Sequence, residues 1–142
     1  MNTKKAQKEI KKTKRKVGIV LLSMLIIGAC FVYWNFFSLQ GVPTGELIRT
    51  IESPNGDYKL KTYFQDGGSL SLDAVRGELV HLKTNSTKTI YWNYPDKDPF
   101  VEWLNETTVK IGDQTLHISK QETYDWRDDE NYTRGYPKQF IK

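Results

Sequence analysis

The residues with the greatest capacity for chemistry form a short charged group in the middle of the chain. Arg76 and Glu78 lie two positions apart, and Asp73 comes shortly before them. In an extended segment, side chains two positions apart point to the same face, so the two charges would meet. Two interpretations follow: a polar cleft of a ligand-sensing or hydrolytic domain, or an ion pair that fixes strand register. We favour the ion pair, because most such pairs are structural, and keep the cleft as the alternative.

Aromatic residues form a second candidate group, and they gather in residues 89–94, "TIYWNY". Strand alternation would place Ile90, Trp92 and Tyr94 on the core face and the residues between them on the opposite face. We therefore predict that Tyr91 and Asn93 are exposed. Because exposed tyrosines are enriched at binding hot spots, these two residues, together with Arg76 and Glu78, are the predicted partner-binding residues.

The remaining reactive side chains give weaker signals. His81 and His117 fall in predicted strands, and no Ser or Cys nucleophile motif accompanies them. The acidic residues near the C-terminus lack the Asp-x-Asp-x-Asp-Gly spacing of a calcium loop; they are Asp125, Asp128, Asp129 and Glu130. The sequence therefore predicts that the protein is not an enzyme and has no metal site and no cofactor.

The elements that must position these groups begin with a basic and then apolar N-terminus. Residues 1–16 hold eight Lys or Arg residues, whereas residues 17–37 carry no charge. A helix of that length is about 31 Å long, close to the ~30 Å hydrocarbon core of a bilayer. We predict a basic cytoplasmic arm over 1–16 and a single transmembrane helix over 17–37. Because loops rich in Lys and Arg stay in the cytoplasm, the C-terminal domain should lie outside it, at the cell membrane.

The single cysteine offers an alternative to a plain membrane span. Cys30 ends the stretch Ile27-Gly28-Ala29-Cys30, which resembles a bacterial lipobox in which the thiol would carry a lipid. The residues that follow are apolar, whereas a lipidated cysteine usually opens a polar tether. We therefore favour an uncleaved span over lipidation of Cys30, and both over a cleaved signal. In either of the first two cases the membrane is a partner, and the basic arm can meet anionic lipid at about 1 kcal/mol per Lys or Arg.

The charge of the rest of the chain has the opposite sign. Residues 38–142 contain 13 basic and 16 acidic residues, a net charge of −3, so the positive charge of the whole chain comes from the N-terminus. A basic domain is the electrostatic signature of nucleic-acid binding, and this domain is not basic. We expect another envelope or membrane protein as its partner, and no nucleic acid.

The patterns after the span predict a small all-β domain over residues 46–127, following a linker over 38–45 and preceding a polar tail over 128–142. Short alternating segments are separated by turn signals such as "SPNG" and "DGG". Residues 69–75 are expected to be a strand with Leu70 and Leu72 facing the core, and Gly77 to mark a bulge or bend before the next strand. The predicted fold is a sandwich or curved meander of seven or eight antiparallel strands.

The motifs of this domain, in order, resemble one known family. They are "SPNGDYKL", "DGG", "RGEL", "IYWNY", "VEWL", "TTVKI" and "TYDWR", which together run from about residue 46 to residue 127. The family consists of short single-pass membrane proteins of Gram-positive bacteria that carry domain of unknown function 5412. The resemblance implies the same architecture here and supplies no activity or catalytic residues.

Overall fold

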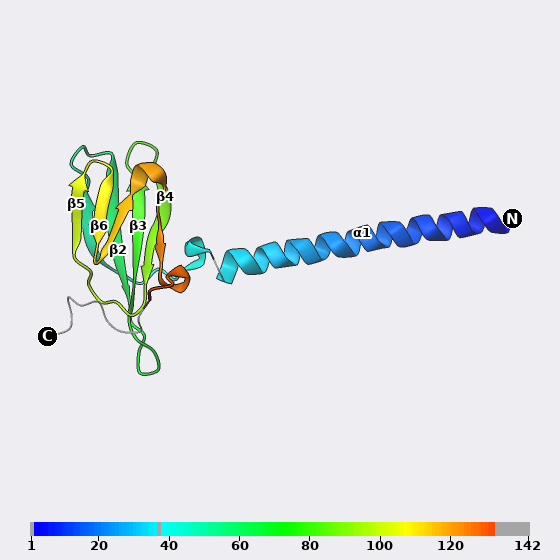
Figure 1. Ribbon diagram of the computed structural model, residues 1–142, viewed down its shortest axis with the longest axis horizontal. Helices are drawn as coiled ribbons and strands as arrows, with labels where there is room; N and C mark the ends of the chain where they lie inside the picture. The colour runs from blue at the N-terminus through cyan, green and yellow to red at the C-terminus, as the bar shows by residue number, and fades with distance from the viewer. Residues whose placement is uncertain (1, 37, 133–142) are drawn as a thin grey trace. The chain divides into compact units, whose positions relative to one another are not determined.

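The computed structural model describes residues 2–36 and 38–132 and divides into two compact units, residues 1–41 and 42–142. The first unit consists of helix α1 (Thr3–Phe36) and the short 3-10 helix η1 (Leu39–Gly41) (Figure 1). The predicted arm and the predicted span 17–37 form one continuous helix as far as Phe36, and Phe37 lies outside the described residues.

Helix α1 is long and apolar enough to cross a membrane. Its 34 residues make it about 51 Å long, more than a bilayer core requires. Its apolar side chains are exposed, as the 71% exposure of Leu25 illustrates. Two polar side chains in the apolar part bond back to the helix: Ser23 Oγ donates to a carbonyl 2.8 Å away, and Asn35 Nδ2 to one at 2.9 Å. These bonds satisfy polar groups that would otherwise be costly in hydrocarbon.

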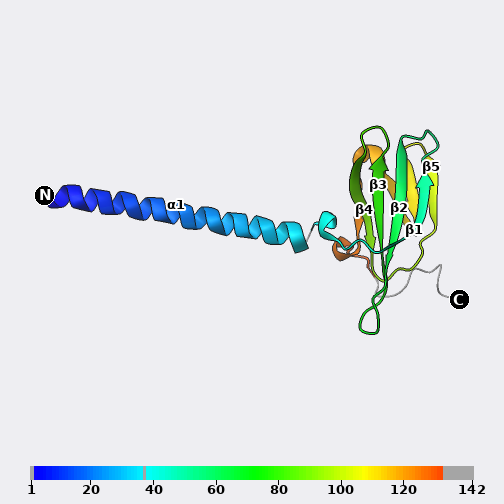
Figure 2. The same cartoon turned by 180° about the vertical axis from the view of Figure 1, so that it is seen from behind.

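The second unit is an all-β domain with two sheets, and the predicted small sandwich of seven or eight strands is confirmed (Figures 1 and 2). Sheet A has the order β1-β2-β3-β4-β8 and sheet B the order β5-β6-β7, with only the β4–β8 pair parallel. The strands are β1 (Glu46–Glu52), β2 (Tyr58–Gln65), β3 (Ala74–His81), β4 (Ser86–Asn93), β5 (Val101–Asn105), β6 (Thr108–Ile111), β7 (Gln114–His117) and β8 (Tyr124–Asp125).

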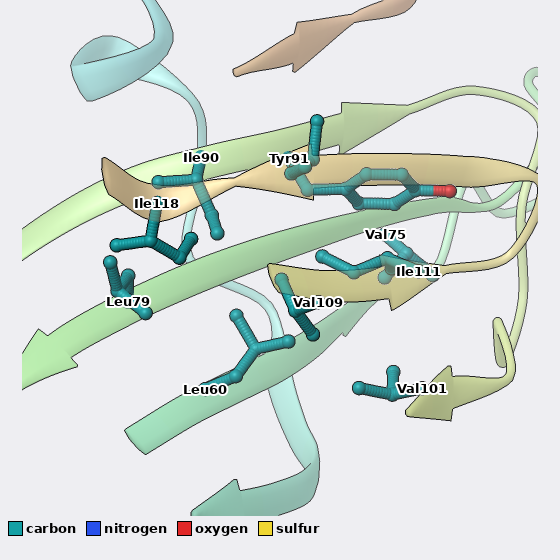
Figure 3. Close-up of a cluster of buried hydrophobic side chains, with 10 residues drawn as sticks. Leu60, Val75, Leu79, Ile90, Tyr91, Val101, Val109, Ile111 and Ile118 are labelled. Atoms are coloured by element: carbon teal, nitrogen blue, oxygen red, sulfur yellow. The ribbon is translucent and has the colours of Figure 1, made fainter. Parts of the chain in front are cut away.

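The core lies between the two sheets and is built from the alternating apolar positions of their strands (Figure 3). Ten buried residues form it: Leu60, Val75, Leu79, Ile90, Tyr91, Val101, Val109, Ile111, Leu116 and Ile118. Two short 3-10 helices, η2 (Ile118–Lys120) and η3 (Trp126–Asp128), flank strand β8.

Two tight turns of the β-domain contain a glycine with a positive φ, and the first of them is the Ser-Pro-Asn-Gly turn that the sequence predicts. The Ser-Pro-Asn-Gly turn joins β1 to β2, with Gly56 at φ +69° and the Ser53 hydroxyl accepting the Tyr58 N–H at 3.0 Å. Gly112, at φ +57°, makes the tight β6–β7 hairpin. Glycine occupies both positions because a positive φ is strained for residues with a Cβ.

The strand bounds predicted around Gly77 are wrong, although a bulge does occur there, because the β3–β4 pairing shifts register between Gly77 and Glu78. Strand β3 runs without a break from Ala74 to His81, and residues 66–73, here named the β2–β3 loop, replace the expected strand over residues 69–75. Leu70, expected to face the core, is 98% exposed. Gly77 is also needed for packing: a Cβ at this position would lie 2.9 Å from the Cβ of Tyr91 on the neighbouring strand.

Candidate functional site

Arg76 and Glu78 form an ion pair on the face of sheet A that points away from sheet B. They alternate along β3 with residues of the core, which fixes their direction. The guanidinium donates to Glu78 Oε2 at 2.8 Å and to Thr89 Oγ1 at 2.9 Å, and it lies 5.7 Å from the centre of the Tyr63 ring. The two side chains are only 10% and 15% exposed. The structure thus shows Arg76 and Glu78 paired with each other and largely buried, as the ion-pair interpretation requires.

The segment just before β1 covers this pair and is not a free linker. Residues 42–45, here named the strap, contribute Thr44, whose Oγ1 accepts a third bond from the Arg76 guanidinium at 2.6 Å. Val42 is buried at 8% exposure. Gly45 lies so close to β2 that a Cβ there would be 1.8 Å from the Phe64 carbonyl oxygen. The second half of the predicted linker 38–45 is thus packed on the sheet.

Asp73 does not join Arg76 and Glu78. Its carboxylate accepts the Gly67 N–H at 3.2 Å and lies 3.5 Å from Lys97 Nζ, so it closes the base of the β2–β3 loop. The polar cleft that these three residues would form is therefore absent from the part of the chain that the structure describes, because the acid that would complete it faces a different element.

Tyr91 and Asn93 are not the exposed binding residues that alternation predicts. Tyr91 is 1% exposed and lies in the core, with its ring among the apolar side chains (Figure 3). The reason is a bulge in β4: Gly77 pairs with Tyr91 and Glu78 with Thr89, so Ile90 is an extra residue. One extra residue inverts the alternation after it. Asn93 is half-buried and donates inward, to Asp96.

Asp96 is a buried carboxylate that sequence reasoning missed. It has no exposed surface, and it accepts hydrogen bonds from Tyr91 Oη at 2.7 Å, Asn93 Nδ2 at 3.0 Å and the Lys97 N–H at 2.8 Å. Burial raises the pKa of Asp96, against the three donors, which favour its charged form. Burial and the neighbouring carboxylate raise the pKa of Tyr91 as well. The sequence shows Asp96 only as an acidic residue in the "PDKDP" loop, and such a composition is typical of an exposed turn.

The described part of the predicted polar tail packs on the domain. Tyr124 of β8 stacks on Tyr91 with ring centres 5.6 Å apart, and its hydroxyl donates to Asp129 at 3.0 Å. Trp126 lies against Tyr94 and Tyr132 at 5.2 and 5.1 Å. Residues 128–132 therefore belong to the domain, and residues 133–142 of the predicted tail lie outside the described residues. Asp125, one of the acidic residues near the C-terminus, accepts the Arg127 N–H at 3.0 Å and so caps η3.

The two histidines lie in separate arrangements. His117 Nδ1 is 2.7 Å from Glu122 Oε2, and this carboxylate also accepts the His117 N–H at 2.8 Å, which lowers the pKa of Glu122. His81 packs edge-on to Tyr58 and borders a pocket of about 420 Å³ between β4 and η2. Within residues 2–36 and 38–132, no three His, Cys, Asp or Glu side chains lie close enough together to hold a metal ion.

Large apolar side chains are exposed in two places on the β-domain. Four of these side chains lie on or next to strands β1 and β5, the adjacent rims of the two sheets (Figure 2), and are here named the edge patch. Its residues are Leu47, Ile48, Phe100 and Leu104, between 38% and 55% exposed. An Arg49–Asp98 ion pair at 2.8 Å joins the two rims. The second place is the β2–β3 loop, with Leu70 and the 41% exposed Leu72.

These features define a class of protein: an all-β sandwich domain that follows an apolar N-terminal helix, with a largely buried ion pair on its larger sheet. The family model described as "Family of unknown function (DUF5412)" matches residues 11–129, and the chain belongs to this family. The family resemblance seen in the sequence is thereby confirmed.

A curated relative and the solved structures complete the comparison. The chain is 57% identical over 37 residues to "Uncharacterized protein YrzH" of Bacillus subtilis (strain 168). That match covers 26% of this chain and 86% of the relative. No solved structure gives a significant match.

Proposed function

We propose that this protein is a single-pass membrane protein whose β-domain lies outside the cytoplasm and binds another membrane or envelope protein without catalysing a reaction. The apolar helix supports the anchor, and the Lys and Arg residues before it support a cytoplasmic N-terminus. The internal bonds of three polar side chains support a role without catalysis. Arg76 donates to Glu78 and to Thr44, and Asp96 accepts from Tyr91.

The observation that carries the binding role is the edge patch. Its four large apolar residues border two edge strands, and sheet edges and exposed apolar patches are recurrent interaction surfaces. Charged residues lie among them, namely Glu46, Arg49 and Glu102. Such a mixture of apolar anchors and charges is the composition of a protein interface, in which the charges set specificity and the apolar groups exclude water. The occupant is therefore a protein surface with complementary charges.

Site-specific photo-crosslinking in intact cells tests this role. A photoreactive residue at Leu104 should give one defined adduct, and the same residue at Thr115, exposed on β7, should not give it. Leu47→Asp, on the neighbouring rim, should abolish the Leu104 adduct, whereas Thr115→Asp should preserve it. The proposal fails if the adducts from positions 104 and 115 are the same, or if Leu47→Asp leaves the Leu104 adduct unchanged.

The orientation has its own test. A protease added to cells stripped of their wall should digest residues 38–142 while an epitope fused ahead of Met1 stays protected. Digestion of the N-terminal epitope, with the β-domain protected, would reverse the proposed orientation.

A further inference from the structure

We propose that the β2–β3 loop is a second membrane contact, whose tip inserts Leu70 into the headgroup and acyl boundary of the bilayer that α1 crosses. This inference rests on the anchoring role of α1 in the proposed function. It concerns a surface separate from the edge patch, and its occupant is lipid.

The first observation is the composition of the loop tip. Residues 67–72 read Gly-Gly-Ser-Leu-Ser-Leu and carry no charge. Leu70 is 98% exposed, more than any other large apolar residue in the described part of the β-domain. The edge patch, in contrast, has charges among its apolar residues. An uncharged tip that presents a leucine suits the bilayer boundary, where the apolar side chains of interfacial segments are buried.

The second observation is that the loop satisfies its own backbone donors. Four of the six backbone N–H groups of residues 67–72 have acceptors within the protein. Gly67 donates to Asp73 at 3.2 Å, Gly68 to Asp66 at 2.7 Å, Ser71 to the Gly67 carbonyl at 3.3 Å and Leu72 to the Tyr94 hydroxyl at 3.3 Å. Unpaired backbone groups are what makes irregular loops costly in lipid. This loop has most of its donors paired before it meets a membrane.

The third observation is where the chain enters the β-domain. Pro43 of the strap and Leu72 of the loop line the same pocket of about 250 Å³, together with Trp92 and Tyr94. The loop projects from the end of the sandwich at which β1 begins and β5 begins (Figures 1 and 2). The length of the chain limits the distance between the end of α1 and the strap. Phe36 and Pro43 are seven positions apart, so at most about 25 Å of extended chain separates them.

Together these observations point to the bilayer as the occupant. The loop borders the first residues of the domain, and those residues are tied by a short chain to the apolar helix. Aromatic residues accompany it, and Trp and Tyr are enriched at the headgroup level of membrane proteins. The β-domain would thus be held at the surface through two contacts, the helix and the loop.

The test measures depth in the bilayer with single-cysteine variants of the full chain, all made in Cys30→Ser. An environment-sensitive fluorophore is placed at Leu70→Cys in the loop, at Ile27→Cys in α1, and at Leu104→Cys on β5. Leu104 is 50% exposed and lies near the end of β5, away from the loop. Each variant is reconstituted in phosphatidylcholine and phosphatidylglycerol vesicles with or without acyl-brominated lipid, which quenches only fluorophores in contact with the acyl region.

We expect strong quenching at position 27, quenching at position 70 several-fold greater than at position 104, and a blue-shifted emission at position 70. Bromine close to the headgroup should quench position 70 best, whereas bromine near the bilayer centre should quench position 27 best. Quenching at 27 with equal, weak quenching at 70 and 104 overturns the loop contact and leaves the anchor intact. Absence of quenching at 27 overturns the anchor, and with it the inference built on it.

Discussion

The Arg76–Glu78 pair on β3 and the β2–β3 loop that precedes this strand are two neighbouring regions whose residues behave in opposite ways. The charged pair is 10% and 15% exposed and bonded to the strap, whereas the loop presents Leu70 with 98% of its surface free. Burial of charge is costly unless it is paired, and exposure of a large apolar group has no benefit to folding. The residues that could do chemistry thus support the fold, and a residue suited to the core is left available for contact.

The largest expected effect comes from breaking the buried pair. Arg76→Ala should lower the free energy of unfolding by about 3 kcal/mol, because it leaves Glu78 buried without its partner. The measurement is chemical denaturation of the full chain in detergent, followed by tryptophan fluorescence. Replacing both residues, as Arg76→Met with Glu78→Leu, should recover most of the loss.

A matched surface pair serves as the control for that experiment. Arg49 also pairs with an acid, Asp98, but the two side chains are 36% and 55% exposed. Arg49→Ala should cost less than about 1 kcal/mol. Equal losses for Arg76→Ala and Arg49→Ala would show that the buried pair contributes no more to stability than the surface pair does.

The buried Asp96 predicts an intermediate effect that depends on pH. Because its pKa is raised in the folded state, the folded protein holds the proton more tightly than the unfolded chain does. Stability from this group is therefore greatest below the ordinary Asp pKa of about 3.9 and falls as the pH rises through the folded-state pKa, by at most about 1.4 kcal/mol per pH unit.

Denaturation midpoints of the wild type and Asp96→Asn, measured across that acidic range, check the sign. The wild type should lose stability relative to Asp96→Asn as the pH rises from about 4. Asp113→Asn, which removes an exposed carboxyl in the β6–β7 turn, is the control for the replacement of one acidic side chain. A gain in the stability of the wild type relative to Asp96→Asn with rising pH would refute the raised pKa.

The smallest expected effect on stability comes from the loop. Leu70→Ser should change the free energy of unfolding in detergent by less than about 0.5 kcal/mol, since the side chain has no packing partner to lose. Leu60→Ala, at a core position 1% exposed, should cost about 2 to 5 kcal/mol in the same assay. A large loss for Leu70→Ser would mean that the loop packs on the domain and does not serve as a contact.

Strand alternation predicted most of the fold, and it failed where the backbone departs from a regular ladder. Tyr58, Leu60 and Phe64 of β2 face the core as their spacing predicts. The same rule misplaced Tyr91, because the bulge at Ile90 has no mark in the sequence of β4 itself. Gly77, which pairs with Tyr91, stands out in the sequence. That a side chain there would collide with Tyr91 follows only when the partner strand is known.

The candidate site was less predictable than the fold because its contacts join distant parts of the chain. Arg76 donates a hydrogen bond to Thr44, which lies 32 positions earlier in the chain, and no local pattern in the strap indicates that bond. The alternating Ser-Leu-Ser-Leu of residues 69–72 reads as a strand, but the flanking Asp66 and Asp73 accept backbone N–H groups and stabilise a loop. The pairing of Arg76 with Glu78, two positions apart on one strand, was within reach of sequence reasoning.

The strap also determines how mechanical load would enter the β-domain. Tension arriving along the chain from the N-terminal side would otherwise act first on β1, an edge strand that can peel from β2 one hydrogen bond at a time. The burial of Val42 and the 2.6 Å bond from Arg76 to Thr44 lie ahead of β1 and connect the incoming chain to β3, in the middle of the sheet. Force is thereby distributed over several strands at once, and the edge strand is relieved of it.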